Sequence, residues 1–269
     1  MSRHLGNPLL HSARQSGWLL IRFSQREISN RFAGSLLGGV WSAVHPVALL
    51  LIYTFVFTTV FKARALTDES TPFVVFLAVA LWPWMAFQEA VLRGTTAVVS
   101  NAALIKKVRF AHELLVYAAV AASFVLQLFG WVIALTLLAV WGTEFHWTGV
   151  PRALAALGGI AILATGLALL LGAVHVFVRD LEHGVAHALM VVFYLSPVLY
   201  SAAMVPDWMK SIMLLNPVAV LIEAARSALL AGQAAPDWPE LVALACCLGL
   251  LALGRAAFRR LSPHFEEAL

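Results

Sequence analysis

A long stretch without charge constrains this chain more than any other feature of its sequence. Residues 32–61 contain no Asp, Glu, Lys or Arg, and most of them are apolar. About twenty apolar residues, each rising about 1.5 Å, cross the hydrocarbon core of a bilayer, so residues 41–61 are predicted to form a transmembrane helix. The Gly- and Ser-rich residues 32–40 should bend the chain at the membrane surface. Pro46 should kink the helix or mark its effective start.

Further apolar stretches predict five more spans, at 72–92, 114–140, 152–178, 184–201 and 239–258. The composition agrees, because a soluble domain of 269 residues could not cover the apolar surface of a chain that is 61% hydrophobic and 12% charged. The mean hydropathy is +0.86. The sequence therefore predicts an all-α integral membrane protein with six transmembrane helices within residues 33–258.

The basic residues predict the topology of the chain. The net charge is +4, and Lys and Arg gather at the ends of the spans, where membrane lipid rather than nucleic acid is the expected partner. Six spans put both termini on one side, and thirteen Lys and Arg residues fall on that side against five on the other. The positive-inside rule then places both termini in the cytoplasm. No short apolar segment precedes a small-residue cleavage site, so no removable signal peptide is expected.

The N-terminal region is predicted to be a polar tail, residues 1–16, followed by an amphipathic helix, residues 17–32. Four of its apolar residues fall within an arc of about 80° on a helix: Trp18, Ile21, Ile28 and Phe32. Arg22 and Arg26 lie outside that arc. The pattern favours an interfacial helix lying on the membrane with its arginines toward lipid phosphates. A helix packed on the protein's own cytoplasmic face is the alternative, and the two can both hold.

Residues 100–113, between the second and third spans, are too charged to cross a bilayer and too apolar for a simple linker. Asn101 is expected to cap a short helix. That segment mixes apolar and basic residues: Leu104, Ile105, Lys106, Lys107, Val108, Arg109 and Phe110. A cytoplasmic helix with one face available to a partner is the functional interpretation. A solvated connection lying on lipid headgroups is the alternative.

Residues 202–233, between the fifth and sixth spans, hold two apolar runs, 211–222 and 227–236, interrupted by Pro217 and by the Glu223 and Arg226 pair. Each run is too short to cross a bilayer, which favours half-inserted helices that enter from the outer face and return. Such broken segments are tolerated where they are buried in protein or line a cavity. The sequence therefore predicts an outer gate here, followed after the sixth span by a cytoplasmic tail, residues 259–269.

Motifs of enzymatic chemistry are missing. The sequence has no GxxxxGK[ST] P-loop, no GxSxG and no pair of carboxylates placed centrally within spans. His183 and His187 offer only two nitrogens, without the Glu of a zinc hydrolase, so no metal site is expected. Cys246 and Cys247 are expected to be buried and to form no disulfide framework. Two ion pairs are expected on helices: Glu89 with Arg93, and Glu223 with Arg226.

Five stretches carry a resemblance to a known family. They are RFAGSLLGGVWSAVHPVALLLIYTFVF at 31–57, NAALIKKVRFAHELL at 101–115, VRDLEH at 178–183, YLSPVLYSAAMVP at 194–206 and LNPVAVLIEAARSALLAG at 215–232. Each is weak alone, but the set resembles the permease subunits of ABC-2 type transporters that export polysaccharides such as O-antigen, capsule or teichoic acid. The sequence departs from that family at Ala111, where the family often has Pro, which affects the start of the third span.

The resemblance implies a homodimer of six-span subunits in the bacterial inner membrane, paired with two cytoplasmic ATPase subunits and moving a lipid-linked polysaccharide. ATP and Mg²⁺ would bind to the partner ATPase, and this chain would bind no cofactor and catalyse no reaction. The rival interpretations are a related permease for a small lipophilic molecule or lipo-oligosaccharide, a membrane enzyme acting on lipid-linked sugars, and a structural membrane scaffold.

The residue patterns and the resemblance together assign hypothetical roles. Residues 101–110 would couple the chain to the ATPase, as a coupling helix. Arg22, Arg26 and Arg31 would guide a substrate or lipid headgroup, with ordinary lipid anchoring as the alternative. The aromatic candidates for the channel lining are Trp41, Tyr53, Phe57, Tyr194 and Tyr200, together with Trp82 and Trp84, which an interfacial aromatic belt explains equally well. The outer gate would include Pro197, Pro206, Asn216, Pro217, Glu223 and Arg226.

Overall fold

The computed structural model describes residues 8–34, 38, 40–60, 72–108 and 110–269. Within these ranges the chain consists of helices and connections and contains no strand, in agreement with the all-α prediction. Residues 1–7, the end of the first predicted span at Phe61, and Arg109 lie outside the described residues.

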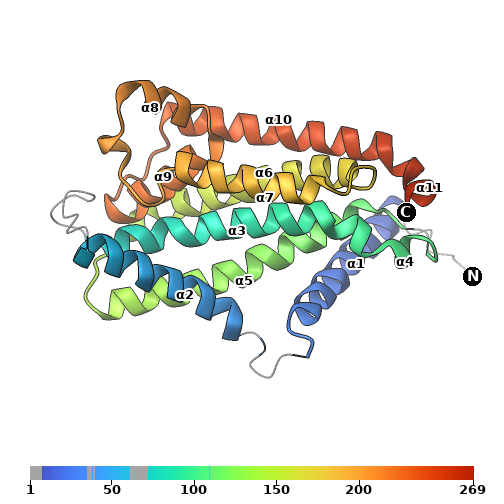
Figure 1. Cartoon of the computed structure of the whole chain (residues 1–269), viewed down its shortest axis with the longest axis horizontal. Helices are drawn as coiled ribbons and strands as arrows, with labels where there is room; N and C mark the ends of the chain where they lie inside the picture. Colours follow the sequence, from blue (N-terminus) through green and yellow to red (C-terminus); the bar gives the residue numbers. More distant parts are fainter. Residues whose placement is uncertain (1–7, 35–37, 39, 61–71, 109) are drawn as a thin grey trace, which may run out of the picture.

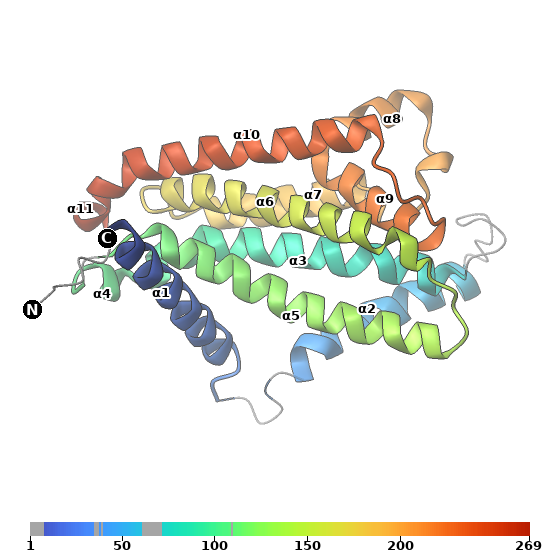
Figure 2. The ribbon, with the colours of Figure 1, turned by 180° about the vertical axis from the view of Figure 1, so that it is seen from behind.

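Four long helices lie side by side as a bundle (Figures 1 and 2). They are α3 Phe73–Ser100, α5 Glu113–Val140, α6 Val150–His175 and α10 Trp238–Leu261. Two shorter apolar helices pack against α3: α2 Val40–Phe55, which continues as the π-helical segment η1 Val56–Val60, and α7 Leu181–Leu195. The bundle has two ends. The C-terminal end carries α4 Ala102–Ile105 and α11 Phe265–Ala268, and the α8 end carries α8 Asp207–Leu214 and α9 Pro217–Leu230.

Each of the six predicted spans contains a helix, and four of these helices are long and apolar enough to cross a membrane. α7 has 15 residues and is about 22 Å long, which is shorter than a hydrocarbon core of about 30 Å. It ends at Leu195 rather than at the predicted Ser201, because Ser196 takes an extended backbone before Pro197. α2 continues through Pro46, and α3 runs to Ser100, past the predicted end at Leu92.

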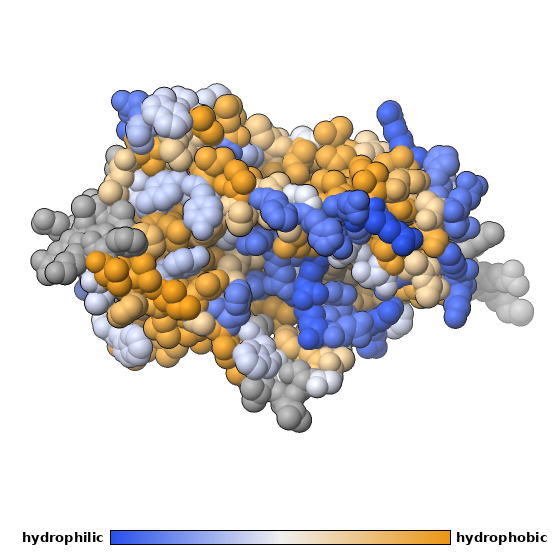
Figure 3. Space-filling model, in the orientation of Figure 1, coloured by the Kyte–Doolittle hydropathy of each residue, from blue (hydrophilic) through white to orange (hydrophobic). Residues whose placement is uncertain are grey.

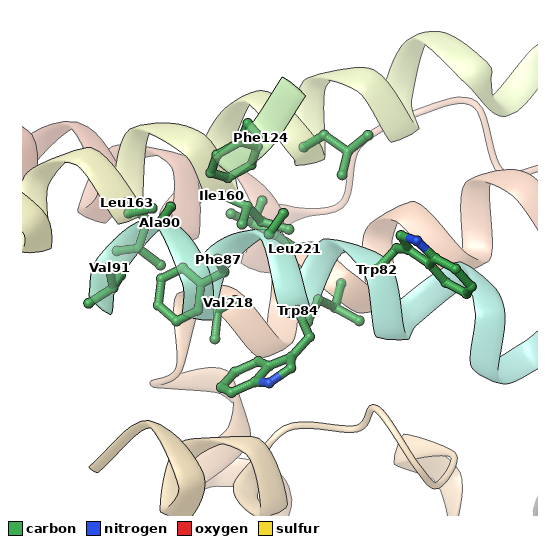
Figure 4. Close-up of a cluster of buried hydrophobic side chains, with 14 of the residues drawn as sticks. Trp82, Trp84, Phe87, Ala90, Val91, Phe124, Ile160, Leu163, Val218 and Leu221 are labelled. Carbon is green, nitrogen blue, oxygen red and sulfur yellow. The ribbon is translucent and has the colours of Figure 1, made fainter. Parts of the chain in front are cut away.

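α3 lies at the centre of the bundle, in contact with α2, α5, α6, α7 and α9. Trp82 and Trp84 are almost completely buried in this core, so neither faces a channel or the membrane (Figure 4).

Elsewhere small residues allow two helices to approach closely. A Cβ placed on Gly166 of α6 would lie 2.7 Å from the backbone nitrogen of Leu251, so any larger residue would push α10 away.

α1 spans Pro8–Arg31, so the predicted polar tail is helical from Pro8 onward. Pro suits the first turn of a helix, where its missing N–H is not needed. The helix packs obliquely against α5 and begins near the C-terminus (Figures 1 and 2). Trp18 and Ile21, on the predicted apolar face, stay exposed, at 58% and 59%. The protein contacts a different face of α1, through Phe23 and Arg31, so Trp18 and Ile21 are left at the surface.

The expected C-terminal tail is ordered. α10 continues to Leu261, and the chain then turns through the 3₁₀ helix η5 Ser262–His264 into α11. Phe258 and Phe265 are completely buried, which explains why this segment folds against the bundle instead of extending from it. Cys247 is buried as expected, but Cys246 is exposed on the outer side of α10.

Candidate transport and coupling sites

The segment predicted to couple to a partner forms the short helix α4 at the C-terminal end. Asn101 precedes this helix but does not cap it with its side chain, because its Nδ2 donates to the Ala97 carbonyl oxygen at 2.9 Å. Ile105 is buried, while Lys106, Lys107 and Val108 are exposed. The surface presented to the outside is therefore basic with one apolar residue. Leu104 packs against the core, and Arg109 lies outside the described residues.

A chain of aromatic rings ties this segment to the rest of the C-terminal end. The Phe110 ring lies 5.4 Å from that of Phe23 on α1 and 5.4 Å from that of His112. His112 stacks on Phe265 of α11 at 6.1 Å, and Phe265 contacts Phe258 of α10 at 5.3 Å. Burial lowers the pKa of His112 below its usual value. A movement of the coupling segment would therefore be passed to both α1 and α11.

Charged residues reinforce the same connection. Glu113, the first residue of α5, accepts a hydrogen bond of 2.8 Å from Arg259 and lies 3.4 Å from Arg255, both on α10. A cavity of about 430 Å³ lies between these elements, lined by Phe110, Ala111, His112, Glu113, Phe258, Arg259, Ser262, Pro263 and Glu266. The coupling segment is thus fixed by both apolar and ionic contacts to the end of α10.

The three arginines predicted to meet a headgroup separate into two kinds. Arg22 and Arg26 are exposed, and Arg22 also lies over the Trp18 ring, 5.1 Å from its centre. The side chain of Arg31 is only 4% exposed, and its guanidinium donates to Glu89 and to the Ser123 hydroxyl, both at 2.8 Å. The two terminal nitrogens of Arg31 are therefore used within the protein, and Arg22 and Arg26 are the two of the three that lie at the surface, where a lipid phosphate could meet them.

The Arg31 cluster contains further charges and amides. Glu89 also accepts from Arg93 at 3.0 Å, which confirms that predicted ion pair, and from Gln127 Nε2 at 2.8 Å. Glu27 lies 3.8 Å from both Arg31 and Arg93. A cavity of about 500 Å³ adjoins the cluster where α1 turns into α2, which we call the elbow cavity; it is lined by Arg31, Phe32, Trp41, His45, Pro46, Met85, Gln88, Glu89, Leu92, Arg93, Leu126 and Gln127.

At the α8 end, Arg226 organises the predicted gate. It is 3% exposed, pairs with Glu223 at 2.6 Å as predicted, and donates to the carbonyl oxygen of Pro197 at 2.7 Å. Its guanidinium also lies 3.7 Å from the centre of the Phe76 ring on α3. Asn216 donates to the Ser196 hydroxyl at 3.0 Å. α9 is thus fixed to α3 and to the turn that follows α7.

The break between α8 and α9 differs from the one expected from the sequence. The two helices are bent by 99° at Leu215 and Asn216, and Pro217 begins α9. Glu223 and Arg226 lie inside α9, which ends at Leu230, so the run 227–236 is not a second half-helix. The physical reason is that the Glu223 and Arg226 side chains neutralise each other within one helix. Pro206 precedes α8 and is exposed, away from the Arg226 cluster.

One buried ion-pair network was not predicted. Arg152 at the start of α6 donates to Glu240 at 2.8 Å and to Asp237 at 3.0 Å, both at the start of α10. It also donates to the backbone and side-chain oxygens of Gln233. The sequence contained a sign of this network, because residues of opposite charge occur at the predicted outer ends of two spans. The positive-inside count, however, treated Arg152 as a loop residue.

The predicted channel aromatics are brought together only in part: Tyr53 on α2 interacts with Tyr194, which bonds to Tyr200, whereas Trp41 lies apart. Trp41 lines the elbow cavity and is 55% exposed. Tyr200 donates to the Tyr194 backbone oxygen at 2.9 Å, so these two lie together after α7. Tyr53 and Phe57 are partly buried, four residues apart on α2 and η1, and the Phe57 ring lies 5.4 Å from that of Phe73. Among the described residues, no group of His, Cys, Asp and Glu is placed to hold a metal ion.

Helices of this length and apolarity, packed around a central span with ionised clusters between them, define a polytopic membrane protein of the transporter kind. Residues 19–230 match the model of the ABC-2 type transporter family, and the chain belongs to that family.

Several similar proteins are known. An O-antigen export system permease protein RfbA from Myxococcus xanthus is 32% identical over 267 residues, which cover 97% of this chain and 99% of that protein. An RfbA protein of the same description from Klebsiella pneumoniae is 27% identical, covering 93% and 95%. The polysialic acid transport protein KpsM of Escherichia coli is 26% identical, covering 77% and 79%.

Proposed function

We propose that this chain is the permease subunit of an ABC transporter that exports a lipid-linked polysaccharide of the O-antigen, capsular or teichoic-acid type across the bacterial inner membrane. The observation that carries the proposal is the 32% identity to an O-antigen export permease over nearly the whole length of both chains. ATP and Mg²⁺ would be bound by a separate cytoplasmic ATPase subunit. ATP binding by a separate subunit fits a sequence without a P-loop.

The proposed topology has six crossings, with both termini in the cytoplasm. In this topology α2 with η1 would form the first crossing and α7 the fifth, although both are short. The bent pair α8 and α9 would lie on the outer side, between the fifth and sixth crossings. Figure 3 supports a homodimer, because hydrophilic surface gathers beside α7 and α1 on a face that would otherwise meet lipid. Exposed polar residues at membrane depth are costly unless they face water or another protein, so this face would line the channel between two copies.

The coupling segment would dock on the ATPase through Lys106, Lys107, Val108 and Arg109. The first three are exposed and form a surface that an acidic cleft with an apolar pocket could receive. Force applied there would reach α1 through Phe110 and Phe23. Because α1 lies along the proposed path of a lipid-linked substrate, ATP-driven movement of the coupling segment would change access to that path.

Arg22 and Arg26 would guide the pyrophosphate of the lipid carrier, since both are exposed on α1. Tyr194 and Tyr200 would offer aromatic faces to the glycan on the outer half of the channel. The gate itself would move about the bend between α8 and α9, while Arg226 keeps α9 attached to Pro197 and Phe76.

The test reconstitutes the purified permease with its ATPase in vesicles. Export is measured as the ATP-dependent binding of a lectin to the lipid-linked glycan on the side opposite the ATPase. Reversing the charges of Lys106, Lys107 and Arg109 to Glu should abolish export while the protein still inserts. Arg260→Glu, a charge reversal at an exposed position near the end of α10, is the control and should export normally. ATP-dependent transport of a small lipophilic dye without any glycan transport would overturn the proposal.

A further inference from the structure

Two residues that line the elbow cavity each carry a buried polar atom that lacks a hydrogen-bond partner among the described residues, and the two atoms are of opposite kind. One is a donor, Nε of Arg31, and the other is an acceptor, Oε1 of Gln127. Both residues line the cavity, and both side chains are more than nine-tenths buried. Buried polar groups in folded proteins are almost always paired, so an unpaired donor and acceptor beside one cavity point to a ligand that bonds to both.

The orientation of Gln127 follows from its neighbour. Glu89 only accepts hydrogen bonds, so Gln127 turns its amide nitrogen to that carboxylate at 2.8 Å and leaves its oxygen without a partner. The two terminal nitrogens of Arg31 donate to Glu89, Ser123 and the Ala119 carbonyl. Its Nε faces Glu27 Oε1 at 3.8 Å, which is too long for a hydrogen bond, so Nε is the donor left without one. The remaining bonding capacity of the cluster is therefore one donor and one acceptor.

The cluster lies deep along the bundle. Glu89 precedes the end of α3 at Ser100 by eleven residues, or about 16 Å, and Gln127 follows the start of α5 at Glu113 by fourteen residues, or about 21 Å. The cluster therefore lies among the packed helices, away from the C-terminal end of the bundle, where buried polar side chains need partners.

The charge balance selects against a phosphate. Arg31 and Arg93 are matched by Glu27 and Glu89, which lie 2.8 to 3.8 Å from them, so the cluster has no net charge. A fully ionised phosphate has no proton to donate to the Gln127 oxygen and would be repelled by Glu89. A hydroxyl group accepts from Arg31 and donates to Gln127 at the same time.

The rest of the lining suits a sugar ring. Trp41 offers an exposed aromatic face, and Pro46, Met85, Leu92 and Leu126 are apolar. A volume of about 500 Å³ is within the range of ordinary small-molecule sites, which combine apolar walls with a few polar groups. Trp41 and His45 are exposed, so the cavity is open to the outside of the protomer.

We propose that the elbow cavity binds a hydroxyl-bearing sugar of the transported lipid, separately from the phosphate groups, and so distinguishes a glycosylated carrier from a bare one. This inference rests on the proposed function and adds the part of the substrate that the cavity recognises. Gln127 and Arg31 bond to one sugar hydroxyl, and Trp41 packs on the ring. Arg22 and Arg26 on the exposed face of α1 remain available to the phosphates.

The experiment uses the permease with its ATPase in nanodiscs and two probes: a polyprenyl pyrophosphate carrying one N-acetylhexosamine and the same lipid without the sugar. ATPase stimulation is titrated with each probe. In the native protein the glycosylated lipid should act at a lower concentration. Gln127→Leu should raise its half-maximal concentration about three- to tenfold, the range expected for one lost hydrogen bond, and leave the bare lipid unchanged.

Trp41→Leu, at an exposed position where folding is not at risk, should produce the same selective loss. Trp141→Leu, an exposed tryptophan at the end of α5 outside the cavity, should leave both titrations unchanged. Equal titrations of the two probes by the native protein, equal weakening of both by the variants, or no effect of either variant would overturn the sugar site and leave the cavity to water. Absence of stimulation by both lipids in the native protein would overturn the proposed function and the site with it.

Discussion

Two buried arginines, Arg152 at the α8 end and Arg31 beside the elbow cavity, are equally inaccessible and differently used. Their side chains are 3% and 4% exposed. Arg152 directs its nitrogens to Glu240, Asp237 and both oxygens of Gln233. Arg31 leaves Nε without a hydrogen bond and borders a cavity of about 500 Å³. The difference separates an arginine that holds two helices together from one that retains bonding capacity for a ligand.

The surroundings of the two residues fit that distinction. Arg152 joins the starts of α6 and α10, which are also in close contact at Gly166 and Gly254, so its neighbours have little freedom to move. Arg31 joins α1 to α3 and α5 and is the last residue of its helix. A contact at a helix end beside a cavity can be rearranged without disturbing the core.

The largest expected effect comes from breaking the Arg152 network. Arg152→Ala leaves Glu240, which is 2% exposed, without its partner, and the expected loss of stability is about 3–5 kcal/mol. Thermal unfolding of the purified protein in detergent measures it. Arg260→Ala, at an exposed position on the last turn of α10, is the control and should change stability by less than about 0.5 kcal/mol. A small loss at Arg152 would mean that water already reaches Glu240.

The sequence alone predicted local features well and distant ones poorly. The Glu89–Arg93 and Glu223–Arg226 pairs follow from spacings of four and three on a helix, and both are present. The Arg31–Glu89 and Arg152–Glu240 pairs join residues 58 and 88 positions apart, so they depend on how the helices pack. Periodicity does not report that packing.

The same limit explains the misplaced boundaries. The start of α9 had a local signal in the sequence: Asn216 precedes the helix, and Pro217 occupies its first turn. The charged pair in the middle of α9 was taken for a second break, although its spacing of three already allowed the two side chains to pair within one helix. The end of α10 was taken for a tail because the burial of Phe265 by His112 and Phe177 comes from other elements.

A second prediction compares the apolar attachment at the C-terminal end with the ionic one at the α8 end. Phe265→Ala removes a completely buried ring that contacts Phe258, Phe177 and His112, and the expected cost is about 2–3 kcal/mol, below the usual range for such a change because α11 can unfold locally. Hydrogen exchange should rise in residues 100–113 as well as in α11. Phe129→Ala, an exposed phenylalanine on α5, is the control, and unchanged exchange in 100–113 would separate α11 from the coupling segment.

A conservative substitution at both arginines sharpens the comparison further. Lys keeps the charge but loses the planar arrangement of donors. Arg152→Lys is expected to cost about 2 kcal/mol because several oxygens lose their donor in a closed site. Arg31→Lys is expected to cost about 1 kcal/mol, since water in the elbow cavity can replace the lost bonds. Thermal unfolding of the two variants under the same conditions measures both losses of stability. Equal losses would contradict the assignment of Arg31 to an open site.

The smallest expected effect is on the pH dependence of stability, through His112 at the C-terminal end. The pKa of His112 is lowered by burial, so the folded protein favours the neutral ring. Above about pH 6.5 the ring is neutral in both folded and unfolded chains, and as the pH falls below that value the unfolded chain takes up the proton first, so folding weakens. Glu266, which faces the ring, opposes the shift and keeps the effect small.

The test is the change in thermal midpoint between pH 7.5 and pH 5.5 for the native protein and for His112→Phe. Phe keeps the ring contacts with Phe110 and Phe265 and cannot take up a proton, so the variant should lose less stability on acidification than the native protein. Identical pH responses of the two proteins would show that the ring at position 112 titrates as freely in the folded chain as in the unfolded one.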